Sequence, residues 1–140
     1  MATTFPLDDL CVVWLPSQTP LVFGTTLFAN ILPDTPAAAV AVYEYPGGEG
    51  QDTFQDPNLP AGLPTIAEHK FQVVVRDPNA QTARSTIDTV HKALAKVVNL
   101  TINGARYLRI APNQEPFFLH RDAQRRVYYA CNYTASRTPN

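Results

Sequence analysis

The chain has 140 residues, of which 45% are hydrophobic and 16% charged, and its formal net charge is −1. This length is typical of one domain with a buried core, and the hydrophobic content excludes a disordered chain. No apolar run approaches the roughly 18 residues of a membrane-spanning helix, and two cysteines are too few for a disulfide framework or a four-cysteine zinc site. We therefore expect a single domain over residues 1–140 and no membrane partner.

Charge is divided unevenly along the sequence. Residues 1–69 contain eight acidic residues and no lysine or arginine, whereas residues 70–140 contain all eleven basic residues and four acidic ones. This division is compatible with head-to-tail self-association, with a basic surface that faces nucleic acid, or with two halves that interleave and scatter their charges. The first residues lack the positive charge and apolar stretch of a secretory signal, so we expect folding in a reducing, cytosolic compartment.

The first half predicts one short helix, extended segments and a long loop. Apolar residues at helical spacing over 7–15 predict a short helix that ends at Pro16. Residues 21–32 and 37–45 are predicted to be extended, the second of them because it is rich in valine and tyrosine. Residues 46–66 contain many glycines and prolines without periodicity, so they predict a long loop arm.

The second half predicts one long helix and most of the sheet. The helix covers 78–98, with Asp77 as its N-cap and an apolar side that includes Ile87, Val90 and Leu94. Asn-Gly at 103–104 predicts a hairpin turn. Strands are predicted over 69–76, 107–110, 115–120 (an edge strand) and 125–135. Together these elements indicate an α+β fold: a mixed, largely antiparallel sheet packed by one long and one short helix, with a long loop arm.

Residue types that carry catalysis are present but not in recognisable arrangements. The glycines at 47–50 lack the strand-to-helix turn and the lysine of a phosphate-binding loop. The three histidines lie in separate predicted elements without metal-ligand spacing, and His91 with Asp88 lacks a nucleophile in a recognisable turn. We therefore expect no enzyme, no cofactor and no metal site, and a small hydrolase with an unrecognised site is a weak alternative.

Aromatic and basic residues gather near the end of the chain. Arg125, Arg126, Tyr128, Tyr129 and Tyr133 have the composition of a surface on which nucleotide bases stack. Ordinary strand composition also explains the tyrosines, and dedicated nucleic-acid binders are usually more basic than this chain. A nucleic-acid-binding module is therefore a more distant alternative.

Four short segments, in a fixed order, carry a family resemblance. They are FANILPDTP at 28–36, EYPGG at 44–48, FQVVVR at 71–76 before the long helix, and PFFLHRDAQR at 116–125 running into VYYACNY at 127–133. This series resembles the minor capsid and tail terminator proteins of tailed bacteriophages, over about residues 20–136. The resemblance implies a small α+β subunit without catalytic residues. It also implies a ring, commonly of six copies, that caps the tail tube and joins the tail to the head-completion proteins.

The same resemblance implies a place in the virion and a set of partners. The protein would be made in the bacterial host cytoplasm and would reside in the virion, at the neck between head and tail. Its partners would be further copies of itself, the tail tube protein and the head-completion or stopper protein, and DNA would at most pass through the ring lumen. A head-completion or stopper connector of the same neck is the alternative.

The candidate partner interface combines the loop arm with the turn before the last strand. Acidic residues of the arm could meet bases on a neighbouring copy or on the tube protein, and two apolar residues could insert as anchors. A loose surface loop without a partner is the competing interpretation of the arm. The candidate interface residues are Glu49, Asp52, Phe54, Asp56, Leu59, Arg121, Asp122, Arg125 and Arg126.

Overall fold

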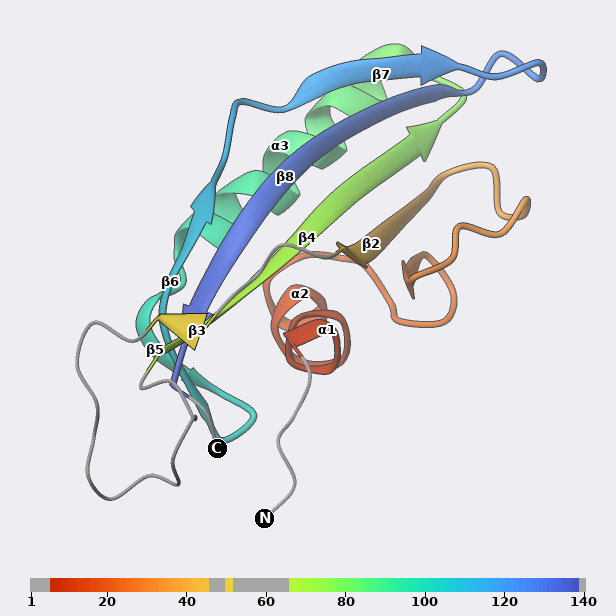
Figure 1. Cartoon of the computed structure of the whole chain (residues 1–140). Coiled ribbons are helices and arrows are strands. Elements are labelled where there is room, and N and C mark those ends of the chain that lie inside the picture. The colour runs from red at the N-terminus through yellow and green to blue at the C-terminus, as the bar shows by residue number, and fades with distance from the viewer. Residues whose placement is uncertain (1–5, 46–49, 52–65, 139–140) are drawn as a thin grey trace, which may run out of the picture.

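The computed structural model describes residues 6–45, 50–51 and 66–138, and these form a mixed sheet with helices packed on one face (Figure 1). The helical segments are α1 (Pro6–Asp8), η1 (Asp9–Trp14), α2 (Leu15–Gln18) and α3 (Ala80–Ala95). The strands are β1 (Leu27–Ala29), β2 (Ala39–Tyr45), β3 (Gly50–Gln51), β4 (Ile66–Asp77), β5 (Val98–Ile102), β6 (Ala105–Pro112), β7 (Phe117–Arg121) and β8 (Val127–Arg137). The predicted α+β class and the mixed sheet are confirmed.

Two long strands, β4 and β8, form the centre of the sheet. The strand order is β1-β2-β4-β8-β6-β5, and β3 pairs with β4 while β7 pairs with β8. The pair β1–β2 is parallel and the other strand pairs are antiparallel. Strands β7 and β6 pair with successive stretches of β8, near residues 127–130 and 133–137. The acidic half of the sequence therefore builds one edge of the sheet, and the basic half builds the other.

Helix α3 forms where the apolar periodicity predicts it, but it is shorter than expected. Its buried side contains Ala83, Ile87, Val90, Ala93 and Leu94, so the predicted burial of Ile87, Val90 and Leu94 is confirmed. The predicted N-cap, Asp77, is wrong, because the Asn79 side chain accepts from the backbone N–H groups of Gln81 and Thr82, while Asp77 accepts from Asn79. At the other end, Val98 already belongs to β5.

The N-terminal helix is longer than predicted. It continues past Pro16 to Gln18, so the expectation that Pro16 ends it is wrong. The preceding turns are a π-helix, η1, in which the Leu15 N–H donates to the Leu10 carbonyl. Pro16 then occupies the first turn of α2, where a missing N–H costs little. The wider turn thus accommodates a proline that would interrupt a regular helix.

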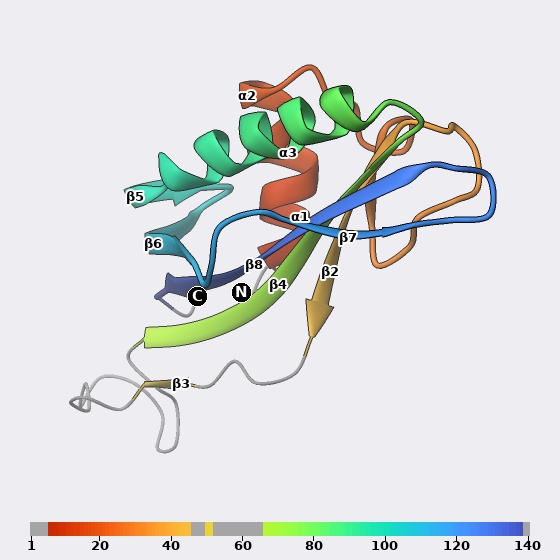
Figure 2. The same ribbon diagram turned by 90° about the horizontal axis from the view of Figure 1, so that it is seen from above.

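The helices cover one face of the sheet. α3 contacts β4, β8 and β6, and the N-terminal helix contacts β1 and β2 (Figure 2). The Trp14 indole joins the two helices, since its Nε1 donates to the Ala93 carbonyl at 3.0 Å. Alternate residues of β4 and β8 point into this layer, among them Phe71, Val73, Cys131 and Tyr133. In the described parts of the chain, no helix covers the opposite face.

The hairpin at residues 103–104 forms as predicted, whereas the segment 46–66 differs from the prediction. Asn103 and Gly104 have φ of 53° and 83°, as the predicted hairpin between β5 and β6 requires. The predicted loop over 46–66 is interrupted, because Gly50–Gln51 pairs with β4 at Ile66 and Ala67. No described helix is both long and apolar enough to cross a membrane.

Candidate protein interface

The turn between β7 and β8 is organised by one carboxylate. Oδ1 of Asp122 accepts from the backbone N–H groups of Gln124 and Arg126, both at 2.9 Å. Its Oδ2 accepts from Arg126 Nε at 2.7 Å and from the Tyr128 hydroxyl at 3.0 Å. Four donors on one carboxylate fix a tight turn in which Arg125 adopts a φ of 66°. Asp122 is therefore a structural centre of this turn.

These hydrogen bonds also set the protonation of the turn. Burial alone raises the pKa of Asp122, but the hydrogen bonds from Arg126, Tyr128 and Gln124 outweigh it and lower the pKa to about 2. Hydrogen bonds to Asp122 and Asp34 raise the pKa of Arg126. The Asp122–Arg126 ion pair is therefore fully charged at neutral pH.

Two arginines fasten the loop of residues 31–38, here called the proline loop, to the same end of the sheet. The Arg126 guanidinium donates to the Asp34 backbone carbonyl and to the Asp34 carboxylate, each at 2.8 Å. Arg76 donates to the carbonyls of Pro33, Pro36 and Ala37 at 2.5, 2.6 and 3.0 Å. Both guanidinium groups are buried, so the proline loop and the β7–β8 turn form one connected surface.

The structure separates the candidate interface residues into three groups. Arg121 and Arg125 are exposed at the β7–β8 turn, where Arg121 Nη1 donates to the Arg125 carbonyl at 3.3 Å. Arg126 and Asp122 lie beside them but hold the turn and the proline loop together. The arm residues lie outside the described part of the chain: Glu49, Asp52, Phe54, Asp56 and Leu59.

The edges of the sheet carry apolar side chains that sequence reasoning did not select. Among the described residues, eight large hydrophobic side chains are exposed, and six of them lie on or beside edge strands: Val22, Phe23, Ile31, Val98, Phe118 and Leu119. The sequence indicated part of this, because Pro116 predicts that residues 115–120, which include Phe118 and Leu119, form an edge strand. The segment before β1 carried no comparable signal, since alternation does not show which strand lies at an edge.

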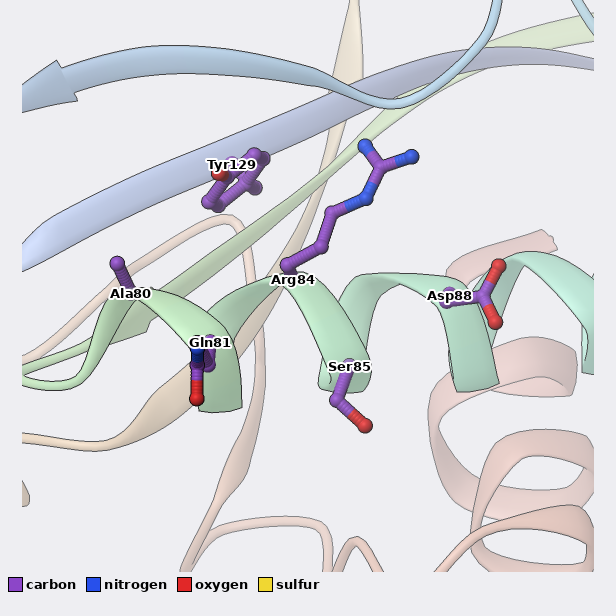
Figure 3. Close-up of a pocket in the computed structure, with 6 residues that line it drawn as sticks. All are labelled: Ala80, Gln81, Arg84, Ser85, Asp88 and Tyr129. Atoms are coloured by element: carbon purple, nitrogen blue, oxygen red, sulfur yellow. The ribbon is translucent and has the colours of Figure 1, made fainter.

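A shallow groove lies between α3 and β8 (Figure 3). It has a volume of about 550 Å³ and is lined by Ala80, Gln81, Arg84, Ser85, Asp88 and Tyr129. The Arg84 guanidinium lies 5.9 Å from the centre of the Tyr129 ring and donates to the Pro116 carbonyl at 3.1 Å. Asp88 is paired with Lys92 at 3.0 Å. Arg84 and Asp88, two of the polar groups that line the groove, are therefore engaged with other residues of the same chain.

His91 and the two cysteines, Cys11 and Cys131, pack within the fold. His91 Nδ1 lies 2.8 Å from the Tyr133 hydroxyl and 4.0 Å from Cys131 Sγ. Both cysteines are buried; burial raises the pKa of the Cys131 thiol and raises the pKa of Cys11 to about 12. A protonated, buried thiol is a poor nucleophile. In the described residues, no three potential ligands gather where they could hold a metal ion.

The aromatic and basic residues of β8 do not form one stacking surface. Tyr133 and the partly buried Tyr129 pack with the helix-covered core, whereas Tyr128 points to the opposite face and stacks on His120 at 4.2 Å between ring centres. Arg126 is engaged with Asp34 and Asp122. The arrangement gives no support to the nucleic-acid-binding alternative.

Proteins of known structure have the same fold, and one protein family has a similar sequence. Among the solved structures that share it, a chain of the "virion of native gene transfer agent (GTA) particle" has a TM-score of 0.58 at 16% identity, covering 84% of this chain and 81% of that chain. A second solved protein has a TM-score of 0.51 at 18% identity, covering 94% and 89%. No curated protein matches the sequence. The family model of the bacteriophage tail terminator protein matches residues 15–139, so the chain belongs to this family of structural phage proteins.

Proposed function

We propose that this chain is the tail terminator of its phage, a ring that caps the tail tube and joins the tail to the head. The observation that carries the proposal is the family match, which spans nearly the whole described fold. In this proposal the ring contains six copies at the head–tail neck, contacts the tail tube protein on one side and the head-completion or stopper protein on the other, and lets DNA pass through its lumen.

The architecture supports a ring. A ring of identical subunits needs two different, complementary surfaces on each subunit. The sheet has two chemically different edges, since β1 and β2 come from the half without bases and β5, β6 and β7 come from the half that contains all of them. The two buried arginines, Arg76 and Arg126, hold the proline loop and the β7–β8 turn in fixed positions, as a repeated contact requires.

The loop arm is part of the proposal as a contact with a neighbouring protein. Its acids Glu49, Asp52 and Asp56 would meet basic groups, and Phe54 and Leu59 would supply apolar contacts. Deletion of residues 53–60 keeps Gly50–Gln51, which pairs with β4. We expect the shortened chain to fold, as circular dichroism would show, and to fail to join tails to heads. A shortened chain that still yields joined, infectious particles would exclude this role.

The function is tested by removing the protein from an infection. Without it, we expect filled heads and separate tails, which negative-stain electron microscopy distinguishes from joined particles. Addition of the purified chain to separated tails should then restore joining. A terminator should bind isolated tails, whereas a head-completion connector should bind isolated heads, so co-sedimentation with each fraction separates the two roles. Joined particles in the absence of the protein would contradict both.

A further inference from the structure

The turn between β7 and β8 carries two exposed arginines that have no acidic partner within the described parts of the chain. Arg121 and Arg125 are exposed, and none of the ion pairs among the described residues includes either of them. Asp122 lies between them in the sequence, but both of its carboxylate oxygens accept from other donors, and Arg126 is one of these donors. Asp34 also contacts Arg126. This end of the sheet therefore presents positive charge that no neighbouring carboxylate pairs with.

Exposed apolar side chains lie next to these arginines. In the described part of the chain, large exposed hydrophobic residues are neighbours in the sequence at three places: Val12–Val13, Val22–Phe23 and Phe118–Leu119. Only the third pair has an arginine within three residues in the sequence. Phe118 is 53% exposed and Leu119 is 40% exposed. We call Phe118, Leu119, Arg121 and Arg125 the β7 tip. Exposed apolar groups beside charged ones are typical of surfaces that bind another protein.

Contacts within the chain already order the β7 tip. The Phe118 ring meets the Tyr129 ring edge to face at 5.9 Å, and Arg121 Nη1 donates to the Arg125 carbonyl at 3.3 Å. Among the described strands, β7 pairs only with β8, and a register irregularity lies between Phe118 and His120. Because such an irregularity hinders the addition of a further strand, we expect a partner to bind through the side chains. A surface that is ordered beforehand loses little conformational entropy when a partner binds.

The arginines of the β7 tip lie at one end of the long central strand β8. The strand order places β1 and β5 at the two sides of the sheet, while the turn between β7 and β8 precedes the start of β8 (Figure 1). A ring that is joined through the sides of the sheet would leave this end of the strands free for a protein stacked on the ring. The position of the tip therefore favours a second protein over a further copy of this chain.

We propose that the β7 tip binds an acidic segment of the tail tube protein, an inference that rests on the proposed function. Carboxylates of that segment would pair with Arg121 and Arg125, and an apolar side chain beside them would cover Leu119. Nucleic acid is a poorer partner for this surface. A phosphate backbone would meet the two arginines but would leave Phe118 and Leu119 exposed to water.

Binding to isolated tails tests the β7 tip. Tails from an infection without the protein are mixed with the purified full-length chain, and co-sedimentation measures the bound protein. Arg121→Glu with Arg125→Glu reverses both charges, and Leu119→Ser removes the apolar contact. The control is Arg109→Glu, because Arg109 is exposed on β6, which pairs with a different stretch of β8. We expect each tip variant to bind tails at least about tenfold more weakly than wild type. Arg109→Glu, and Arg121→Lys with Arg125→Lys, should bind like wild type because the tip stays positive.

Native mass spectrometry of each variant separates tail binding from contacts between copies, with circular dichroism as the check on folding. Weaker tail binding with an unchanged oligomeric state supports the proposal. Tip variants that bind tails like wild type, that lose assembly with other copies, or that lose binding of a short DNA duplex held by wild type would overturn it. An unfolded variant is replaced by Arg121→Ala with Arg125→Ala, or by Leu119→Gln. A wild-type chain that binds no tails would contradict the proposed function and this inference together, whereas equal binding by the tip variants would leave the proposed function standing.

Discussion

The two ends of β8 use the same kind of ion pair in opposite surroundings. At the end of the strand, Arg137 lies 3.3 Å from Asp9, with both side chains at most 2% exposed. Just before its start, Arg126 bridges Asp122 and Asp34, and the Asp34 side chain is 72% exposed. The first pair ties the N-terminal helix to the last strand inside the core, whereas the second ties two surface segments together.

Both ion pairs hold segments of the chain together, but they differ in how much water reaches them. Asp9 also accepts hydrogen bonds from the Tyr107 hydroxyl at 2.5 Å and from Asn103 at 3.1 Å, so its carboxylate is fully surrounded. Burial, followed by the hydrogen bond to Asp9, raises the pKa of Tyr107, which keeps the phenol protonated as the donor. A buried network of this kind tolerates little change, while the network at the turn borders solvent.

The largest effect is expected at the buried end. Asp9→Ala leaves Arg137 as a buried charge that has lost its carboxylate and removes the acceptor of Tyr107 and Asn103. We expect the free energy of unfolding to fall by about 3–5 kcal/mol, the usual result of removing one partner of a buried pair. Urea denaturation measures it, with the exposed neighbour Asp8→Ala as the control. Equal stabilities of the two variants would show that the buried network contributes little.

The substitution of a buried leucine on α3 provides a reference for the loss of stability expected from Asp9→Ala. Leu94 is fully buried on α3 beneath the sheet, and Leu94→Ala should lower the free energy of unfolding by about 2–5 kcal/mol through lost burial and a cavity. The control on the same helix is Lys92→Ala, which removes an exposed i,i+4 pair worth roughly 0.3–0.5 kcal/mol. An unchanged denaturation midpoint for Leu94→Ala would contradict the packing of α3 on the sheet.

Local patterns predicted much of this fold, and contacts distant in sequence explain most of what they missed. The face of α3 and the Asn103–Gly104 turn follow from spacing and backbone preference, which are properties of short segments. The Asp9–Arg137 pair joins residues 128 positions apart, and no local pattern reveals it. Arg121 and Arg125, which the sequence predicts as interface residues, are exposed in the structure. The exposure of Phe23 could not be predicted, because exposure at an edge depends on the strand order.

A smaller loss is expected where Arg76 holds the proline loop. Arg76→Met keeps most of the side-chain volume but removes the donors to three carbonyls of the loop. We expect the free energy of unfolding to fall by about 1–3 kcal/mol, less than for Asp9, because these carbonyls are only part-buried and water can reach them. Amide hydrogen exchange should rise in residues 31–38 and stay unchanged in α3. The control is Gln72→Met, which lies on the same strand and face as Arg76 and is half-buried. Unchanged exchange would mean that the loop is held without the arginine.

The smallest effect, and the most specific to the exposed end, is the pH dependence of the turn. The pKa of Asp122 is lowered from 3.8 to about 2, so its charged form stabilises the folded turn. A carboxyl with a depressed pKa contributes stability above its unfolded value, and this contribution is lost as pH falls through the folded value, here between about pH 4 and pH 2. Asp122→Asn removes the charge, so the melting temperature of wild type should exceed that of the variant above pH 4 and approach it near pH 2. Asp88→Asn, at the exposed pair on α3, is the control for losing a carboxylate. A difference that persists unchanged down to pH 2 would show that Asp122 acts through shape alone, and that the two ends of β8 differ in burial but not in their response to protons.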